Sequence, residues 1–172
     1  MSAFRSVAPA ALPDNLFSRI GDDWMLITAA NSRGEVNTMT ASWGTAGILW
    51  NKPVAICFIR PQRYTYGIVE DADTLTLSFF PAGEYRDALR YCGTKSGRDG
   101  DKFAATGLTV ATAKNGVPYV DEANLVLVCR KLYADDLKEN AFIDPEMLKH
   151  YAAKDYHRFY ICEIVEVLVK EI

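Results

Sequence analysis

The chain is built from short apolar runs separated by polar turns, and most of these runs have the length of a β-strand. Residues 24–30 (WMLITAA) and 53–59 (PVAICFI) are almost continuously apolar, whereas residues 74–80 (TLTLSFF) alternate between apolar and small polar side chains. The polar sequence NSRGE separates the first run from residues 36–43 and predicts the turn of a β-hairpin. The first half of the chain is therefore predicted to be mainly β-structure.

Longer strand-like runs follow in the second half of the chain. Residues 108–113 and 117–120 flank an Asn-Gly pair and predict a second hairpin, with Pro118 at a sheet edge or in the loop. Residues 125–133 and 158–170 are long apolar runs and predict two further strands. These runs are long enough to extend across a whole sheet.

Three details of these runs lead to further predictions. The glycine-containing stretch over residues 44–52 is predicted to be a connection, and Glu163 and Glu166 in the last strand are predicted to face solvent. In residues 36–43, alternation places polar side chains on both faces of the strand, so neither face is plain core. One face carries Val36, Thr38, Thr40 and Ser42, and the other carries Asn37, Met39, Ala41 and Trp43.

Helical patterns are confined to short segments. Thr65 is predicted to cap a helix over residues 66–71, and residues 83–92 have apolar side chains at helical spacing. A loop and a short helix ended by Gly107 follow, and a proline at a first helical position predicts a helix over residues 145–151. The helices are predicted to be insertions between strands.

The order of elements predicts a mainly β (α+β) fold. About seven strands and three or four short helices are expected, without β-α-β regularity or internal repeats. An antiparallel barrel with short helical insertions accounts for this order, and it leaves room for a ligand at its mouth or against a partner subunit. The length of 172 residues predicts a single domain over residues 1–172.

Charge and hydropathy exclude several classes of partner. The net charge of −3 argues against nucleic acid, because proteins that bind its phosphate backbone usually carry a concentrated basic excess. No run approaches the length of about 18 apolar residues that crosses a bilayer, and prolines interrupt the apolar stretch after Arg5, which argues against a signal peptide. A cytoplasmic protein without a membrane partner is predicted.

The four cysteines do not have the spacing of metal ligands. Cys57, Cys92, Cys129 and Cys162 include no C-x-x-C pair and have no pair of histidines nearby, so no metal site is predicted. Three of them lie in apolar runs and are predicted to be buried free thiols in a reducing compartment. Cys92 lies beside a polar loop, and for this residue a redox role is also considered.

A basic corner follows the strand over residues 53–59. The sequence RPQRYT at 60–65 leads into the N-terminus of a predicted helix, where free N–H groups and the helix dipole favour an anion. Arg60 or Arg63 could add a bidentate contact, which suits a phosphate monoester. The alternative is that both arginines are surface residues flanking a turn and that Thr65 is an ordinary cap.

Two other segments have polar patterns that also have ordinary explanations. The glycines of SGRDGDKF at 96–103 allow close approach to an anion, with charge from Arg98 and Lys102, but a solvated loop with internal ion pairs fits equally. The sequence NTMTASWG at 37–44 offers hydrogen bonds and an aromatic wall to a flat polar ring, or it is a strand at the barrel rim. Together the three segments predict a phosphorylated planar heterocycle as the ligand.

The order and spacing of these motifs resemble a known family. NTMTASWG, PVAICFIRPQRYT and CGTKSGRDGDKF occur in the series typical of the flavin reductase-like FMN-binding split-barrel family, and the similarity is greatest to flavoredoxins. The resemblance extends from about residue 20 to the last strand. It implies a six-stranded split β-barrel that forms a homodimer and binds FMN non-covalently near the subunit interface.

The resemblance also implies which residues hold FMN. The polar strand would line the isoalloxazine ring and the ribityl chain, and the RYT corner with Lys102 and Ser96 would hold the 5′-phosphate. The predicted cofactor-binding residues are Asn37, Met39, Thr40, Ala41, Ser42, Trp43, Arg60, Arg63, Tyr64, Thr65, Ser96 and Lys102. The segment His157 to Tyr160 resembles a family segment close to the flavin, but Cys162 stands where relatives often carry glycine.

Two classes of function remain open on these residues. The chain is predicted to be a flavin-dependent oxidoreductase that takes hydride from NAD(P)H, or an electron carrier that exchanges electrons with a redox protein. No catalytic residue is predicted, because the cofactor carries the chemistry and the protein supplies position and electrostatics. A split barrel that binds haem or pyridoxal phosphate is a third alternative.

Overall fold

The computed structural model describes residues 4–12 and 15–170. The strands in these residues are β1 (Phe4–Val7), β2 (Met25–Ala30), β3 (Val36–Ala41), β4 (Gly44–Leu49), β5 (Lys52–Ile59), β6 (Thr74–Phe79), β7 (Val110–Thr112), β8 (Pro118–Val120), β9 (Leu125–Asp136) and β10 (Arg158–Lys170). The α-helices are α1 (Leu16–Gly21), α2 (Tyr64–Asp71), α3 (Arg86–Thr94) and α4 (Lys102–Thr106), and three 3₁₀ helices are η1 (Pro9–Ala11), η2 (Glu139–Ala141) and η3 (Pro145–Tyr151).

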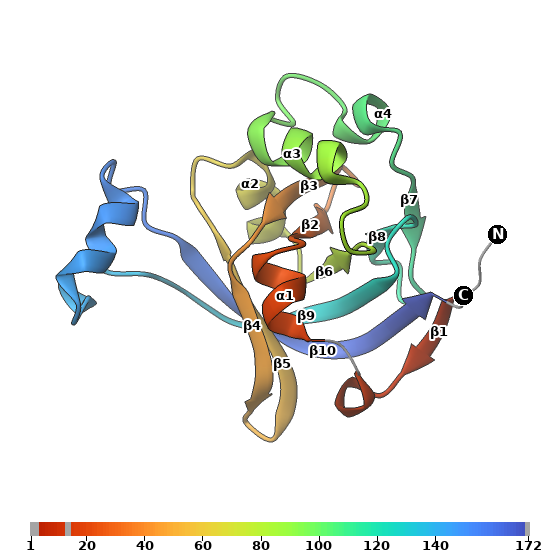
Figure 1. The fold of residues 1–172 in the computed structure, drawn as a ribbon, viewed down its shortest axis with the longest axis horizontal. Helices are drawn as coiled ribbons and strands as arrows, with labels where there is room; N and C mark the ends of the chain where they lie inside the picture. The colour runs from red at the N-terminus through yellow and green to blue at the C-terminus, as the bar shows by residue number, and fades with distance from the viewer. Residues whose placement is uncertain (1–3, 13–14, 171–172) are drawn as a thin grey trace.

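Most strands form one antiparallel sheet. Its order is β3-β2-β6-β9-β10-β5-β4, with β1 paired to the end of β10, while β7 and β8 form a separate hairpin. Strands β3 and β4 lie at opposite ends of this order, yet only Ser42 and Trp43 separate them along the chain. The sheet must therefore curl until these two strands approach each other, and we call the Ser42–Trp43 link the seam. Figure 1 shows the curled sheet, with α3 packed next to β2 and β3 and α4 beside α3.

Two apolar clusters stabilise the two faces of the sheet. The inner cluster fills the curl and includes Met25, Ile27, Leu75 and Phe79, which are at most 1% exposed. The outer cluster packs one face of the sheet against α3 and the β7–β8 hairpin. All four cysteines are free and buried. Cys57, Cys129 and Cys162 lie in the inner cluster, as predicted for the cysteines of the apolar runs, and Cys92 lies in the outer cluster.

The predicted strands over residues 24–30, 36–43, 53–59, 125–133 and 158–170 are confirmed, with small shifts at their ends. The prediction for residues 44–52 is wrong, because most of this stretch forms β4. Its register on β5 begins with Gly44 opposite Cys57. The sequence GTAGIL has small residues and no apolar alternation, so only pairing with β5 defines it as a strand. Strand β1 and helix α1 have no counterpart among the predicted elements.

Two predictions about single side chains are also wrong. Thr65 does not cap α2, because Arg63 occupies the N-cap position and Thr65 lies inside the first turn, where it accepts a hydrogen bond from Asn37. Glu163 is not solvated, since only 17% of its side chain is exposed and it forms ion pairs with Lys52 and Arg130. In both cases a partner distant in sequence determines the environment.

Between β9 and β10 the chain makes a long excursion, and we call residues 137–156 the arm. It contains η2 and η3, and Figure 1 shows it projecting from the barrel beside β5 and β10. The predicted helix over residues 145–151 is present as a 3₁₀ helix with Asp144 as its side-chain cap. In the described residues, no helix combines the length and hydrophobicity needed to span a bilayer.

Candidate functional site

A small cavity lies along the seam and the end of β3. Its volume is about 220 Å³, and we call it the seam pocket. Its lining residues are Met39, Thr40, Ala41, Ser42, Trp43, Phe58, Arg60, Arg63 and His157. A second cavity of about 580 Å³ lies between α1, the seam and β4, and it shares Ser42 and Trp43 with the seam pocket. Strands β3 and β4 are not paired in the sheet, and both cavities adjoin the seam that links them.

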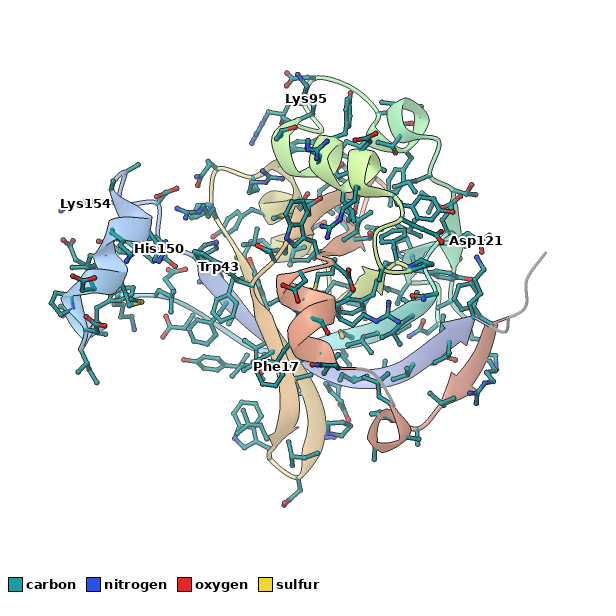
Figure 2. All side chains as sticks on the ribbon, in the orientation of Figure 1. Phe17, Trp43, Lys95, Asp121, His150 and Lys154 are labelled. Atoms are coloured by element: carbon teal, nitrogen blue, oxygen red, sulfur yellow. The ribbon has the colours of Figure 1, made fainter. Side chains whose placement is uncertain are left out.

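Aromatic rings border the seam pocket. The ring of Trp43 lies 5.3 Å from the rings of both His150 and His157, and the ring of Phe58 lies 6.3 Å from that of His157. Figure 2 shows Trp43 directed toward His150 of the arm. Because Trp43 is 43% exposed, its ring offers a flat apolar wall to a ligand.

His157 is the buried histidine of this site. It is 8% exposed, and the Tyr151 hydroxyl lies 2.8 Å from its Nδ1 atom. Burial lowers the pKa of His157 to about 4, so the imidazole is neutral at neutral pH. His157 was not among the predicted binding residues, because a lone histidine at the start of a strand has no distinctive sequence pattern. Only the family resemblance indicated that its segment lies close to the flavin.

Two cations meet at the end of α3, the half-buried Arg63 and the buried Lys102. Arg63 donates to the carbonyl oxygens of Gly93 at 2.6 Å and Cys92 at 3.0 Å, and Lys102 donates to Cys92 O at 3.0 Å and to Thr38 O at 2.9 Å. The last carbonyls of a helix lack intrahelical partners and carry partial negative charge, which favours cations there. The fold thus brings residues 63 and 102 to a single carbonyl.

These cations have no acidic partner. Across residues 4–12 and 15–170, neither Arg63 nor Lys102 forms an ion pair with a carboxylate. Burial and the nearby charge of Arg63 lower the pKa of Lys102 to about 8, and burial also lowers the pKa of Arg63. Lys102 is only 3% exposed. An anion placed beside these two groups would be attracted by both and would relieve their mutual repulsion.

The neighbouring polar groups are packed closely together. Asn37 donates to the Thr65 hydroxyl at 3.0 Å, and both side chains are buried. A Cβ atom at Gly97 would lie 2.5 Å from Cδ1 of Tyr64 and 2.7 Å from Nδ2 of Asn37, so only glycine allows the loop to approach this closely. Asn37, Tyr64, Gly97 and Lys102 line a polar cavity of about 660 Å³.

Two predicted residues have other partners in the structure. Arg60 lines the seam pocket, but its Nη1 atom lies 2.5 Å from the Asp155 carboxylate and its Nη2 atom donates to His150 O at 3.0 Å. The Ser96 hydroxyl accepts a hydrogen bond from the backbone N–H of Arg98 at 3.2 Å. The tyrosine of the basic corner, Tyr64, donates its hydroxyl proton to Glu35.

The predicted residues therefore form two groups. The seam pocket brings together Met39, Thr40, Ala41, Ser42, Trp43, Arg60 and Arg63, and the polar cavity brings together Asn37, Tyr64 and Lys102. Thr65 is buried behind Asn37, and Ser96 lies apart from these linings. The two groups meet at the carbonyl of Cys92, to which Arg63 and Lys102 both donate. A ligand with a flat ring and an anionic tail matches this arrangement.

The described residues contain no group of three or more histidine, cysteine or acidic side chains that could hold a metal ion. The chemical resources of the site are two cations, a polar strand edge, aromatic rings and a neutral imidazole. These resources bind and orient a ligand.

Comparisons with known proteins identify the family and the fold. The sequence model of the family described as "Flavin reductase like domain" matches residues 17–172. No curated protein sequence matches the chain. The fold is similar to an FMN-binding domain of a flavin reductases-like enzyme from Shewanella baltica, with a TM-score of 0.69 and 17% identity over 98% of this chain and 78% of that one.

Two further solved structures have the same fold. Flavoredoxin of Desulfovibrio vulgaris has a TM-score of 0.67 and 23% identity over 93% of this chain and 78% of its own. An FMN-binding protein from Thermus thermophilus has a TM-score of 0.65 and 24% identity over 97% of this chain and 79% of its own. These similarities confirm the predicted antiparallel split-barrel fold with short helical insertions.

Proposed function

Because this chain belongs to the flavin reductase like domain family, we propose that it binds FMN non-covalently and passes electrons from NAD(P)H through it to an acceptor. The observation that carries the proposal is the meeting of Arg63 and Lys102 at the end of α3 without an acidic partner among the described residues. A phosphate monoester carries a charge of about −1.5 to −2 at neutral pH and supplies the missing anion.

The residues around this cation pair fit a phosphate. Helix α2 begins at Tyr64, and its N-cap residue Arg63 makes no side-chain capping bond, so the first turn retains free N–H groups. Asn37 and Thr65 add an amide and a hydroxyl next to this turn. Positive charge, helix N–H groups and small polar side chains are the usual components of a phosphate site. We assign the phosphate to Arg63, Lys102 and Thr65, and we assign Arg60 a different role.

The seam pocket fits the flat part of the cofactor. Strand residues from Met39 to Trp43 would line the ring edge, and Phe58 and His157 would contribute apolar and neutral polar contacts. Bound FMN supplies hydride and single-electron exchange with its partners. The protein's own contribution is to hold the phosphate, orient the ring and exclude water, and its neutral His157 adds no positive charge to the pocket.

A second candidate function is that of an electron carrier without a substrate of its own. One structural neighbour is a flavoredoxin. Rapid mixing of the FMN-loaded protein with NADH or NADPH separates the two functions. Flavin bleaching faster than that of free FMN supports the reductase, and bleaching no faster than the free-flavin background supports the carrier.

FMN binding itself is tested by titrating the apoprotein with FMN and following flavin fluorescence. We expect saturable quenching with one FMN bound per chain. Haem or pyridoxal phosphate in place of FMN predicts no flavin absorbance and no quenching. Saturable binding of either alternative cofactor without FMN binding would overturn the proposal.

We further propose that the working form is a homodimer. Phe17 on α1 is 91% exposed, and Ile48 and Trp50 on the β4–β5 hairpin are 75% and 55% exposed. A cavity of about 500 Å³ lined by η1, α1 and β4 residues lies beside this hairpin. Exposed apolar side chains next to apolar hollows are typical of a surface that pairs with a second copy. The buried free thiols fit a cytoplasmic protein.

A further inference from the structure

We propose that the arm (residues 137–156) selects and holds the electron donor at the seam pocket, and that Arg60 is the positioning residue that keeps the arm there. This inference rests on the proposed function, because it assigns a role in binding the reductant of FMN. It gives Arg60 a task different from holding the cofactor phosphate. The pairing of Arg60 with Asp155, which we call the latch, is the contact that carries it.

The latch has several bonds at one point. Arg60 donates to the Asp155 carboxylate at 2.5 Å and to His150 O at 3.0 Å, and its guanidinium lies 5.0 Å from the ring centre of Tyr151. Gln62 donates to the same Asp155 oxygen at 2.7 Å. The side chains of Arg60 and Asp155 are only 25% and 21% exposed, so water screens this pair less than a surface pair.

The arm depends on this latch because it packs little against the barrel. Most of its residues are exposed, and Ile143 is fully exposed. Its aromatic side chains pack mainly on each other: the ring of Phe142 lies 5.7 Å from Tyr151 and 6.1 Å from Tyr156. The ion pairs Lys149–Glu146 and Lys154–Glu139 are exposed and internal to the arm, and Lys138 pairs with Asp135 at the end of β9. A segment with so few buried contacts can detach locally at small cost unless a specific contact holds it.

The latch also positions the aromatic rings that border the seam pocket. Besides Asp155, the arm residues that contact Arg60 are His150, through its backbone oxygen, and Tyr151, through its ring. His150 packs edge-on against Trp43, and the Tyr151 hydroxyl bonds His157 Nδ1, so both contacts reach the lining of the seam pocket. Figure 2 shows His150 on the arm close to Trp43. Displacing the arm would remove one side of this aromatic border.

The chemistry of this border favours a planar heteroaromatic donor. Trp43 offers an exposed ring face, and a ring that stacks over a bound flavin would meet Trp43 and His150 at the same mouth. The phosphate group, by contrast, would lie at Arg63 and Lys102, which make no hydrogen bond to the arm. Loss of the latch should therefore weaken donor binding and leave FMN binding unchanged.

The test compares Asp155→Asn with a matched variant in the same arm. Glu146→Gln also removes an acidic partner of a basic residue in the arm, but its side chain is 76% exposed and does not touch the barrel. For the FMN-loaded protein, we expect Asp155→Asn to raise KM for NADH or NADPH about tenfold, with kcat and the FMN dissociation constant changed less than about twofold. Glu146→Gln should leave all three values unchanged.

A second measurement does not depend on turnover. Hydrogen exchange of the apoprotein should become faster over residues 138–156 in Asp155→Asn, but not in Glu146→Gln. The exchanged pair Arg60→Asp with Asp155→Arg should slow this exchange again and recover part of the loss in KM, which a merely destabilising substitution would not do.

The outcomes separate this inference from the proposed function. Lack of FMN binding by the unsubstituted protein contradicts the proposed function. Normal FMN binding with an unchanged KM in Asp155→Asn, or a parallel loss of FMN affinity, overturns the role of the arm in holding the donor. Unchanged hydrogen exchange of the arm in Asp155→Asn overturns the latch itself, whether or not NADH or NADPH reduces the flavin.

Discussion

Lys102 is the side chain on which the proposed phosphate site depends most. It is buried and donates only to backbone carbonyls, and removing it leaves Arg63 as the cation at the carbonyl of Cys92. We expect Lys102→Ala and Thr65→Ala each to weaken FMN binding by about 1 to 3 kcal/mol, because each removes a hydrogen bond to a charged group. Fluorescence titration measures the affinity, and thermal unfolding confirms that the variants fold. Lys114→Ala, at an exposed lysine, is the control; FMN retention equal to this control in both variants would refute the assignment.

The lowered pKa of Lys102 predicts how FMN affinity depends on pH. Without a bound ligand the pKa of Lys102 is about 8. A bound phosphate favours the charged lysine and raises the pKa of Lys102. Affinity should therefore be constant just below pH 8 and decline above it, by up to about tenfold per pH unit, because binding then requires uptake of a proton. Titrations between pH 7 and pH 10 measure this slope. Lys102→Met should bind more weakly and lose the decline above pH 8; a persistent decline would assign it to another group.

At the scale of elements, the loop before α4 makes the closest approach in the site. Gly97 lies against Tyr64 and Asn37, and a Cβ atom there would come within 2.5 to 2.8 Å of their side chains. Gly97→Ala must therefore move the loop or break the bond from Asn37 to Thr65, and we expect FMN affinity to fall at least about tenfold. Gly100→Ala is not a suitable control, because Gly100 has a φ of +158°, whereas Gly67→Ala has open space. FMN binding by Gly97→Ala equal to that of Gly67→Ala would contradict this view of the loop.

Local sequence patterns predicted most of the strands but not the seam. Apolar runs such as residues 24–30 and 125–133 can be recognised as strands from the local sequence alone, because their apolar side chains must be buried whichever strands they pair with. Strand β4 has no such run and exists through its register with β5, so it was missed. The arm was predicted only as one short helix, because its position depends on Arg60 and Asp155, which are 95 residues apart in sequence.

The same limit applies to the candidate site. The basic corner and the polar strand could be found because charged or polar residues stand where apolar ones are expected. The hydrogen-bond partners of these residues could not be found in this way. Arg60 was predicted to contact phosphate, and in the structure its guanidinium pairs with the carboxylate of Asp155 in the arm. His157 reaches the pocket only because β10 pairs with β5 and places it near Phe58. The structure therefore adds contacts at the candidate site that the local sequence could not predict, while the roles of the predicted residues stay predictions.

At the scale of the whole molecule, the proposed dimer follows from apolar surface that the single chain leaves exposed. Phe17 and Trp50 together offer two large aromatic side chains near the cavities beside α1 and β4. Burying a large aromatic side chain contributes about 1.5 to 3 kcal/mol, so two copies pairing through this surface would gain several such contributions. Monomeric soluble proteins seldom leave such a patch uncovered.

Phe17→Ser together with Trp50→Ser is therefore expected to shift the protein from dimer to monomer. Sedimentation velocity at equal protein concentrations measures the shift, and Val110→Ser, at an exposed valine on β7, is the control that should remain dimeric. The cavity beside α1 shares Ser42 and Trp43 with the seam pocket, so loss of the second copy should also weaken FMN binding and make it depend on protein concentration. If the unsubstituted protein sediments as a monomer at micromolar concentration, or if the double variant remains a dimer, this surface does not pair the two copies.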